Sequence, residues 1–178
     1  MLIKLESIMN NNKIVFFDID GVFNFTDWYI SDRNPGTLFG QEGELDPLVV
    51  ERFNKIWKET GCSFVMTSDW RLDFPAACKR LYNVGAEFPI IGCTPCHLFD
   101  LTQKDKTRGA EIEHWIKDNL QNEENFNFVI VDDRTDFKKS QKKHFVHVNP
   151  KIGFTDEDMD KTIKILKNNK KIAEIFCS

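Results

Sequence analysis

Acidic and hydroxyl side chains directly follow three apolar stretches of the sequence, and these residue types suit metal and phosphate chemistry. In residues 13–23 the apolar run ends at Asp18 and Asp20, and Gly21 then permits a sharp turn. Two acids that leave a hydrophobic strand together repel each other and resist burial unless a partner compensates them. A divalent cation is the simplest such partner. The other two stretches end in the pairs Thr67-Ser68 and Asp132-Asp133.

The three stretches are short runs of β-forming residues bounded by turn residues, which predicts buried strands. We expect strands at 14–17, 62–66, 88–91, 126–131 and 144–148, and helices at 47–60, 74–83, 107–120 and 156–167. This order predicts an α/β fold with a mainly parallel, Rossmann-like sheet and helices on both faces. Since parallel strands end at one edge, the acidic and hydroxyl residues should share one crevice.

The segment 24–46 connects the first strand to the first helix and is too long for a tight turn, which predicts a flap or small lid. Its aromatic residues Phe25, Trp28 and Tyr29 either pin the flap to the core or stack on nucleic-acid bases. A flap of this size does not seal a site, so it favours a large or extended substrate. The whole chain, 1–178, is predicted to be one domain with this insertion.

Composition excludes several classes of protein. The net charge of −4 argues against a strongly basic nucleic-acid binder. The first residues contain no long apolar run, which predicts neither a signal peptide nor a membrane span. Together with five cysteines, this predicts reduced thiols and a cytoplasmic protein. No obligate protein partner is inferable.

In this order the motifs resemble those of the haloacid-dehalogenase-like (HAD) phosphohydrolase superfamily. Its first, second and fourth motifs correspond to DIDGV at 18–22, FVMT at 64–67 and VIVDD at 129–133. A closer resemblance, over roughly residues 13–168, is to the HAD domains of the Swiss-army-knife RNA repair group. The matching runs are SDWR at 68–71, RGAEIEHWI at 108–116 and GFT at 153–155.

The resemblance implies a mechanism and a set of site residues. Asp18 corresponds to the nucleophile that forms an aspartyl-phosphate, and Asp20 to the general acid and base. Mg²⁺ would be bound by Asp18, by the backbone carbonyl of Asp20 and by an acid of the fourth motif. Asp133 is expected to be the direct ligand, with Asp132 beside it. Thr67 would donate a hydrogen bond to a phosphoryl oxygen.

The third motif of the superfamily is a Lys or Arg upstream of the fourth motif, and here this cation is either Lys106 or Arg108. Arg108 lies four residues before Ile112 and seven before Trp115, on the stripe of the helix that faces the core. It is therefore ranked first, while Lys106 precedes the helix and stays a candidate.

The run at 68–71 carries further candidates. Ser68 either faces the site or caps the next helix. Arg71 either binds substrate phosphate or braces the loop. Trp70 is predicted to pack, and Asp69 to serve the loop or cap a helix.

Two features outside these motifs have alternative interpretations. The run Cys93-Thr94-Pro95-Cys96-His97 matches a haem-attachment string and half of a zinc or redox site, but a loop at the site rim is favoured. A basic run is either a solvated face or a surface for a phosphate-rich substrate; it consists of Lys138, Lys139, Lys142 and Lys143.

The resemblance and the residues together predict an Mg²⁺-dependent phosphohydrolase acting on a phosphate monoester. A polynucleotide 3′- or 5′-phosphate end is the favoured substrate, and a nucleotide or other small molecule is the alternative. A different class stays open: a catalytically weak module that binds phosphate or a partner.

Overall fold

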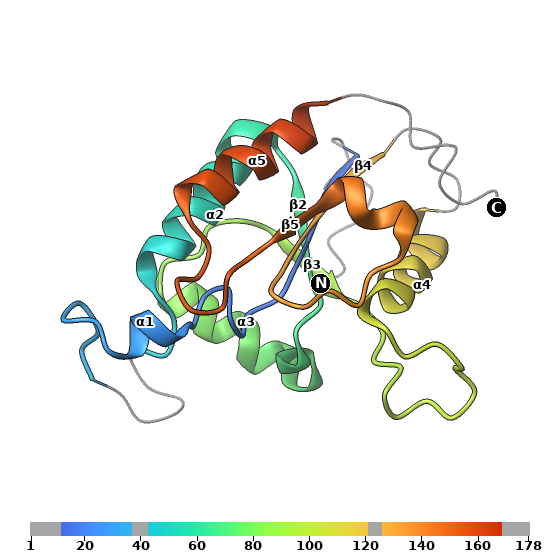
Figure 1. The fold of residues 1–178 in the computed structure, drawn as a ribbon, viewed down its shortest axis with the longest axis horizontal. Helices are drawn as coiled ribbons and strands as arrows, with labels where there is room; N and C mark the ends of the chain where they lie inside the picture. Colours follow the sequence, from blue (N-terminus) through green and yellow to red (C-terminus); the bar gives the residue numbers. More distant parts are fainter. Residues whose placement is uncertain (1–11, 37–42, 121–125, 169–178) are drawn as a thin grey trace, which may run out of the picture.

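The computed structural model describes residues 12–36, 43–120 and 126–168 (Figure 1). Within them, five parallel strands form one sheet in the order β3-β2-β1-β4-β5, so β1 is central. The bounds are β1 Lys13–Phe17, β2 Ser63–Met66, β3 Ile90–Cys93, β4 Asn127–Asp132 and β5 Phe145–His147.

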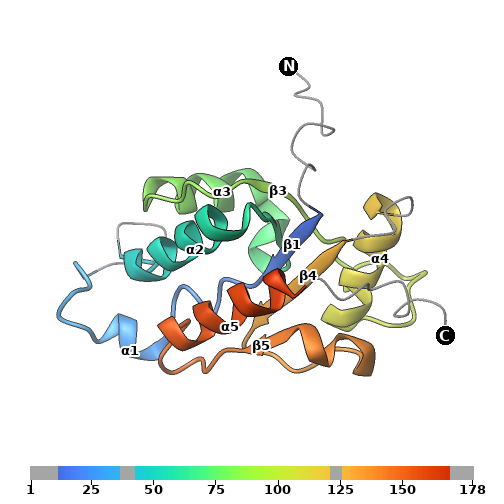
Figure 2. The same cartoon turned by 90° about the horizontal axis from the view of Figure 1, so that it is seen from above.

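Helices cover both faces of this sheet. Helices α2, α3 and α5 lie on one face, and α4 lies on the other (Figure 2). The predicted α/β, Rossmann-like fold is therefore confirmed. The helices are α1 Thr26–Tyr29, α2 Pro47–Thr60, α3 Phe74–Asn83, α4 Arg108–Leu120 and α5 Asp156–Lys167, with 3-10 helices η2 Asp69–Asp73 and η3 Lys139–His144.

The apolar run of β1 reflects burial on both sides of the sheet. Phe17 packs against Phe53 of α2 with a centroid distance of 5.8 Å, whereas Phe16 meets Trp115 of α4 at 5.4 Å. A strand covered on both faces needs apolar residues at successive positions, because alternate side chains enter opposite layers. The central strand is thus held between two aromatic cores, and it positions the residues that follow its end.

Local signals set most element ends. Asp46 caps α2 by accepting a hydrogen bond from Leu48 N, and Gly61 ends the helix with a left-handed φ of 67°. The strand predicted at 88–91 begins two residues later. Pro89 has no N–H to donate to a ladder, and only its carbonyl pairs, with Phe64 N at 2.9 Å.

The flap is described in part, because residues 37–42 of the predicted segment 24–46 lie outside the described ranges. Phe25 and Trp28 are buried, and Trp28 Nε1 donates to Gly43 O at 2.7 Å. These two aromatic residues therefore pin the flap, while Tyr29 stays half exposed. Residues 1–11 and 169–178 lie outside the described ranges. The single domain over 1–178 stays a prediction. None of the described helices has the length and apolarity to cross a membrane.

Candidate active site

Backbone hydrogen bonds place the acidic and hydroxyl residues at one edge of the sheet. The ladder continues one residue past β1 and β2, since Asp18 N donates to Val131 O at 3.0 Å and Thr67 N donates to Phe17 O at 2.8 Å. The ends of neighbouring strands therefore hold these side chains side by side, as the sequence predicts for a parallel sheet.

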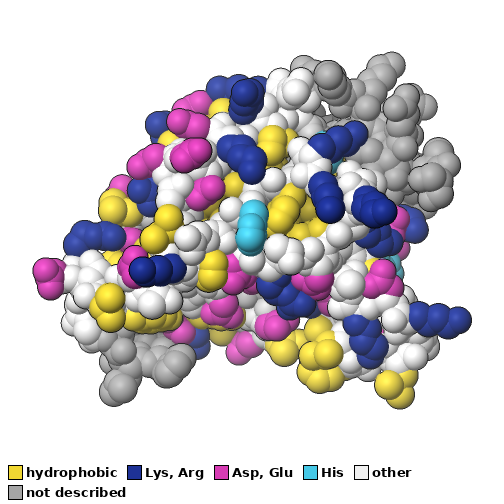
Figure 3. Space-filling view, in the orientation of Figure 1, with side chains coloured by type: hydrophobic (Ala, Val, Ile, Leu, Met, Phe, Trp, Pro, Cys, Tyr) yellow, Lys and Arg dark blue, Asp and Glu magenta, His cyan; other side chains and the backbone are white. Residues whose placement is uncertain are grey.

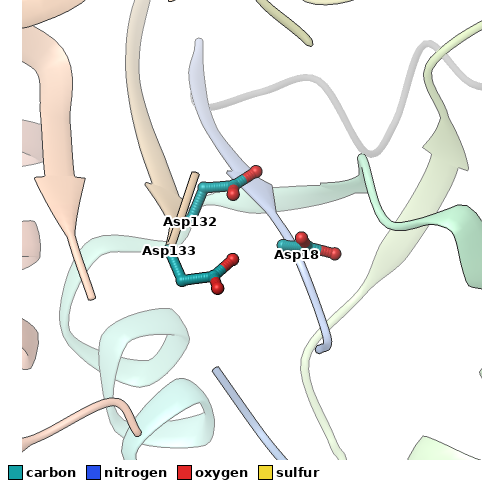
Figure 4. Close-up of side chains that lie close together, drawn as sticks. All are labelled: Asp18, Asp132 and Asp133. Atoms are coloured by element: carbon teal, nitrogen blue, oxygen red, sulfur yellow. The ribbon is translucent and has the colours of Figure 1, made fainter. Parts of the chain in front are cut away.

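Three carboxylates form a cluster at the ends of β1 and β4 (Figure 4). One oxygen each from Asp18, Asp132 and Asp133 lies within 4.8 Å of the others. Asp18 and Asp132 are buried, and Asp133 is half-buried. Hard cations such as Mg²⁺ prefer carboxylate oxygens, so the donor set fits the metal that the sequence predicts.

Burial makes this cluster electrostatically costly in the absence of a cation. Burial raises the pKa of Asp18, against the opposing effects of Arg108 and of a hydrogen bond from Ser68. Burial and the Asp18 charge raise the pKa of Asp132 to about 8. The Asp18 charge therefore opposes ionisation of Asp132, and a divalent cation would offset this repulsion.

The raised pKa of Asp132 predicts that the metal-free protein loses stability as pH rises. The folded chain holds this proton up to a pH of about 8, whereas the unfolded chain releases it near its ordinary pKa of 3.8. Folding therefore takes up a proton between these values, and the free energy of unfolding falls by up to about 1.4 kcal/mol per pH unit. Urea unfolding in EDTA at pH 5, 6.5 and 8 should show this decline, and Asp132→Asn should flatten it. Rising stability over this range would contradict the assignment.

The Arg108 side chain lies against the cluster. Its guanidinium is buried, with Nη2 3.7 Å from Asp18 Oδ2 and Nε 4.0 Å from Asp132 Oδ2. Asp136 holds the start of α4 by accepting from Arg108 N at 2.9 Å. Lys106 is exposed and directs its Nζ to Leu98 O at 2.9 Å. Of the two predicted candidates, only Arg108 lies against Asp18.

The two hydroxyl residues after β2 occupy different positions. Ser68 donates a hydrogen bond to Asp18, and its Oγ also accepts from Trp70 N at 3.4 Å to cap η2. Thr67 Oγ1 is buried and has no hydrogen-bond partner among the described residues. Thr67 is thus the hydroxyl with free hydrogen-bonding capacity, whereas Ser68 contacts Asp18 and also caps η2, so its contacts fit both of its predicted alternatives.

Asp20 is held by two side chains whose contacts the sequence did not predict. Trp70 Nε1 lies 3.1 Å from both carboxylate oxygens of Asp20, and Asn24 Nδ2 donates to Oδ1 at 2.7 Å. The purely packing role predicted for Trp70 is therefore incomplete. Apart from the position of Trp70 in the motif-like SDWR run, the sequence carries no signal for this contact.

Arg71 is buried and hydrogen-bonds other residues of the chain. Its Nη2 donates to both oxygens of Glu111 at 2.8 Å, and its Nη1 donates to Thr67 O. These contacts fit the bracing alternative, while the substrate contact of Arg71 stays a prediction. Sequence reasoning missed Glu111, although it lies three residues after Arg108 on the inward face of α4.

A pocket of about 460 Å³ opens over the carboxylate cluster. The flap forms one wall of it through Phe25, Thr26 and Tyr29. The other walls include Asp18, Asp20, Asp69, Arg108, Asp133 and Arg134.

Gly21 lies so close to Asp133 that a side chain does not fit between them. An added Cβ would lie 2.6 Å from Asp133 Oδ2, and φ is +76°. Gly21→Ala is expected to displace Asp133, weaken Mg²⁺ binding at least tenfold and cost about 1–3 kcal/mol of stability. Calorimetric titration with Mg²⁺ and urea unfolding measure the two effects.

Gly36 provides a matched control, because its φ is +78° but no atom lies within 4 Å of an added Cβ. Gly36→Ala should share the backbone strain and keep the Mg²⁺ affinity. Equal affinities for Mg²⁺ in both variants would contradict the role given to Asp133.

The structure shows the surroundings of the loop at Cys93 and of the basic run, the two features with alternative interpretations. Cys93 and Cys96 are free thiols, and His97 is buried with Nε2 2.9 Å from His114 Nδ1. Within the described part of the chain, Asp18, Asp132 and Asp133 are the one group able to hold a metal through three such ligands. Positive side chains gather around η3 (Figure 3), where Lys138 pairs with Glu113 while three lysines are exposed: Lys139, Lys142 and Lys143.

Comparison with known proteins agrees with the motifs. Residues 14–159, most of the chain, match the family model described as the HAD domain in Swiss Army Knife RNA repair proteins. Neither the curated proteins nor the solved structures contain a match. With the parallel sheet and the acidic edge in place, the chain belongs to this family of HAD domains.

Proposed function

We propose that the chain is an Mg²⁺-dependent phosphohydrolase that cleaves a phosphate monoester through an aspartyl-phosphate. One observation carries the proposal: the site contains three buried polar atoms that have no hydrogen-bond partner among the described residues. They are Thr67 Oγ1, Arg108 Nη1 and Asp132 Oδ2. Each unsatisfied group costs about 1–3 kcal/mol. A phosphate can accept from the first two, and a cation can bind the third.

The side chains of the site divide the reaction between them. Asp18 attacks phosphorus while Arg108 and Thr67 bind phosphoryl oxygens and offset their charge. Asp20 gives its proton to the leaving oxygen, so that the P–O bond breaks without releasing an alkoxide. Asp20 then removes a proton from the water that attacks the aspartyl-phosphate, which frees phosphate and restores Asp18.

Trp70 and Asn24 fix the Asp20 carboxylate during this exchange, since both donate to it. Mg²⁺, held by Asp18, Asp133 and the Asp20 carbonyl with Asp132 beside them, would neutralise charge on the phosphoryl group.

A polynucleotide phosphate end is the proposed substrate. The family's description as RNA repair domains supports it, as does the limited part of the pocket lining that the described flap residues supply. A free nucleotide offers the same phosphate monoester and is the competing substrate. A cytoplasmic location is part of the same proposal.

Phosphate release from a substrate panel tests the proposal. The panel contains 3′- and 5′-phosphorylated oligonucleotides, nucleoside monophosphates, sugar phosphates and phosphopeptides, each with Mg²⁺ and with EDTA. We expect Mg²⁺-dependent release, fastest from one oligonucleotide end. Faster release from nucleotides would replace the polynucleotide substrate, and binding of phosphate with no release from any compound would favour a binding module.

Replacing each of the two candidate cations, Arg108 and Lys106, in separate variants should distinguish their roles. Arg108→Met should lower kcat/KM about 100- to 1,000-fold, because a preorganised donor to the phosphoryl group is lost. Arg108→Lys should retain part of the activity, since it keeps the charge but not the fork of donors. Lys106→Met is the matched control and should change kcat/KM less than about threefold. A larger loss in Lys106→Met than in Arg108→Met would reverse the assignment.

A further inference from the structure

A second pocket of about 480 Å³ adjoins the first one across Asp20. Four residues line both pockets, namely Asp20, Asn24, Tyr29 and Asp69. The volume lies within the range of about 300–1,000 Å³ that is common for small-molecule sites. A group attached to a phosphate in the first pocket can therefore extend past Asp20 into the second.

The walls of the second pocket combine aromatic surface with an excess of negative charge. Tyr29 is 50% exposed and Leu72 is 63% exposed, and Trp70 lies between the pocket and the core. Arg80 is the cation among the described lining residues, and its Nη1 pairs with Glu44 at 3.1 Å. Asp69 pairs with Arg71 at 3.4 Å, outside the lining, whereas Asp20 and Asp73 carry carboxylates for which the described residues supply no ion pair.

Such a lining favours one class of occupant. Aromatic side chains offer flat faces for stacking with a ring, and each base stacked in this way contributes measurably to binding. Carboxylates repel a phosphate but accept hydrogen bonds from amino and hydroxyl groups. The lining thus suits an uncharged ring with polar substituents and disfavours a second anionic group.

We propose that this second pocket binds the leaving group of the phosphate monoester and selects an uncharged nucleoside. The inference rests on the proposed function, because it places the leaving oxygen beside Asp20. On a polynucleotide end, the terminal nucleoside would occupy the pocket and the next phosphate would lie outside it.

A hydrogen-bond network connects the walls of the pocket to the acid. Trp70 and Asn24 both donate to Asp20, and Asn24 also hydrogen-bonds the Tyr29 hydroxyl. Arg80 lies 5.0 Å from the centroid of the Trp70 ring and holds that ring from the α3 side. A nucleoside that touches Tyr29 and Trp70 therefore rests on the groups that position Asp20.

Two substrates that differ only in the base test this selection: adenosine 5′-monophosphate and ribose 5-phosphate. The wild type should prefer the nucleotide at least about tenfold in kcat/KM, and Tyr29→Ala should reduce that preference about fivefold or more. Tyr82→Ala is the matched control, because Tyr82 is 48% exposed but lies on α3 outside the lining, and it should retain the preference. An equal preference in wild type and Tyr29→Ala would overturn the proposal.

Trp70→Phe separates stacking from the hydrogen bond to Asp20. The variant keeps a flat ring but loses the indole N–H, so kcat should fall for both substrates alike while the preference for the nucleotide persists. Selective loss of activity on the nucleotide alone would contradict the positioning part of this role.

Binding of adenosine, which carries no phosphate, tests the pocket independently of catalysis. Titration into the full chain, followed by ligand-observed NMR, should give saturable binding that Tyr29→Ala weakens and Tyr82→Ala preserves. Absence of saturable binding to the wild type would overturn the proposal. Tyr29-dependent binding together with no phosphate release from any substrate would contradict the proposed function and leave the pocket assignment standing.

Discussion

Asp18→Asn is expected to reduce phosphate release at least a thousandfold while stabilising the metal-free chain. The loss follows because an amide cannot form the aspartyl-phosphate, and removing a nucleophile typically eliminates most of a rate enhancement. The geometry should survive, since the substituted amide retains an oxygen to accept the 2.7 Å hydrogen bond that Ile19 N donates to Asp18. Phosphate release and thermal unfolding of the same preparation measure both effects.

The expected stabilisation has an electrostatic cause. Burial raises the pKa of Asp18, and the charge of Asp18 contributes to raising the pKa of Asp132. A neutral side chain at position 18 removes one buried charge. Asp132 can then ionise more easily, because the repulsion from Asp18 is gone and the attraction to Arg108 remains. The melting temperature in EDTA should therefore rise, most clearly near pH 8.

Asp160→Asn is the matched control, because Asp160 is exposed on α5, on the surface of the chain. It should leave both activity and melting temperature unchanged. Equal phosphatase activity in the wild type and Asp18→Asn would contradict the proposed nucleophile, whereas a lower melting temperature would show that the Asp18 charge supports the fold.

The parts of this site that the sequence predicts depend on topology. Asp18 and Asp132 are the residues at which apolar strands end, and parallel strands bring such ends to one edge. The inward position of Arg108 likewise follows from its spacing to Ile112 and Trp115 on a helix. Such inferences need only the period of an element and the direction of its neighbours.

The unpredicted parts depend on side-chain directions in irregular segments. Trp70 reaches Asp20, 50 residues away, because η2 turns its indole toward the site, and no periodic pattern describes a five-residue 3-10 helix. The contact that Arg71 makes could not be predicted, because its partner Glu111 belongs to a different element, α4, whose position relative to η2 the sequence does not show. The pKa of Asp132 depends on complete burial, which emerges only when the layers are packed.

Glu111→Gln is expected to cost about 3 kcal/mol or more of stability, because it leaves the Arg71 guanidinium buried without its main counter-charge. The two side chains are only 3% and 5% exposed, and water cannot replace the lost interaction. The amide can still accept the hydrogen bond that His97 N donates to Oε1 at 2.9 Å, so the change isolates the charge. Urea unfolding measures the cost, provided that the dependence of the unfolding free energy on urea concentration is the same in the variant and the wild type.

The matched control is an exposed ion pair, Glu59 with Lys167, at 3.0 Å. Glu59→Gln should cost less than about 1 kcal/mol, because solvent screens both charges. Similar costs for Glu111→Gln and Glu59→Gln would show that the buried pair contributes no more than a surface pair.

A double variant, Arg71→Met with Glu111→Gln, tests whether charge or packing dominates. Arg71→Met removes the guanidinium that Glu111→Gln leaves unpaired, so the double variant should be more stable than additive losses predict by about 1–3 kcal/mol. Activity should not recover in parallel, because Arg71 Nη1 also holds the carbonyl of Thr67. Stability would then return while the loop that presents the Thr67 hydroxyl stays loose, which separates the contribution of this pair to the fold from its contribution to the site.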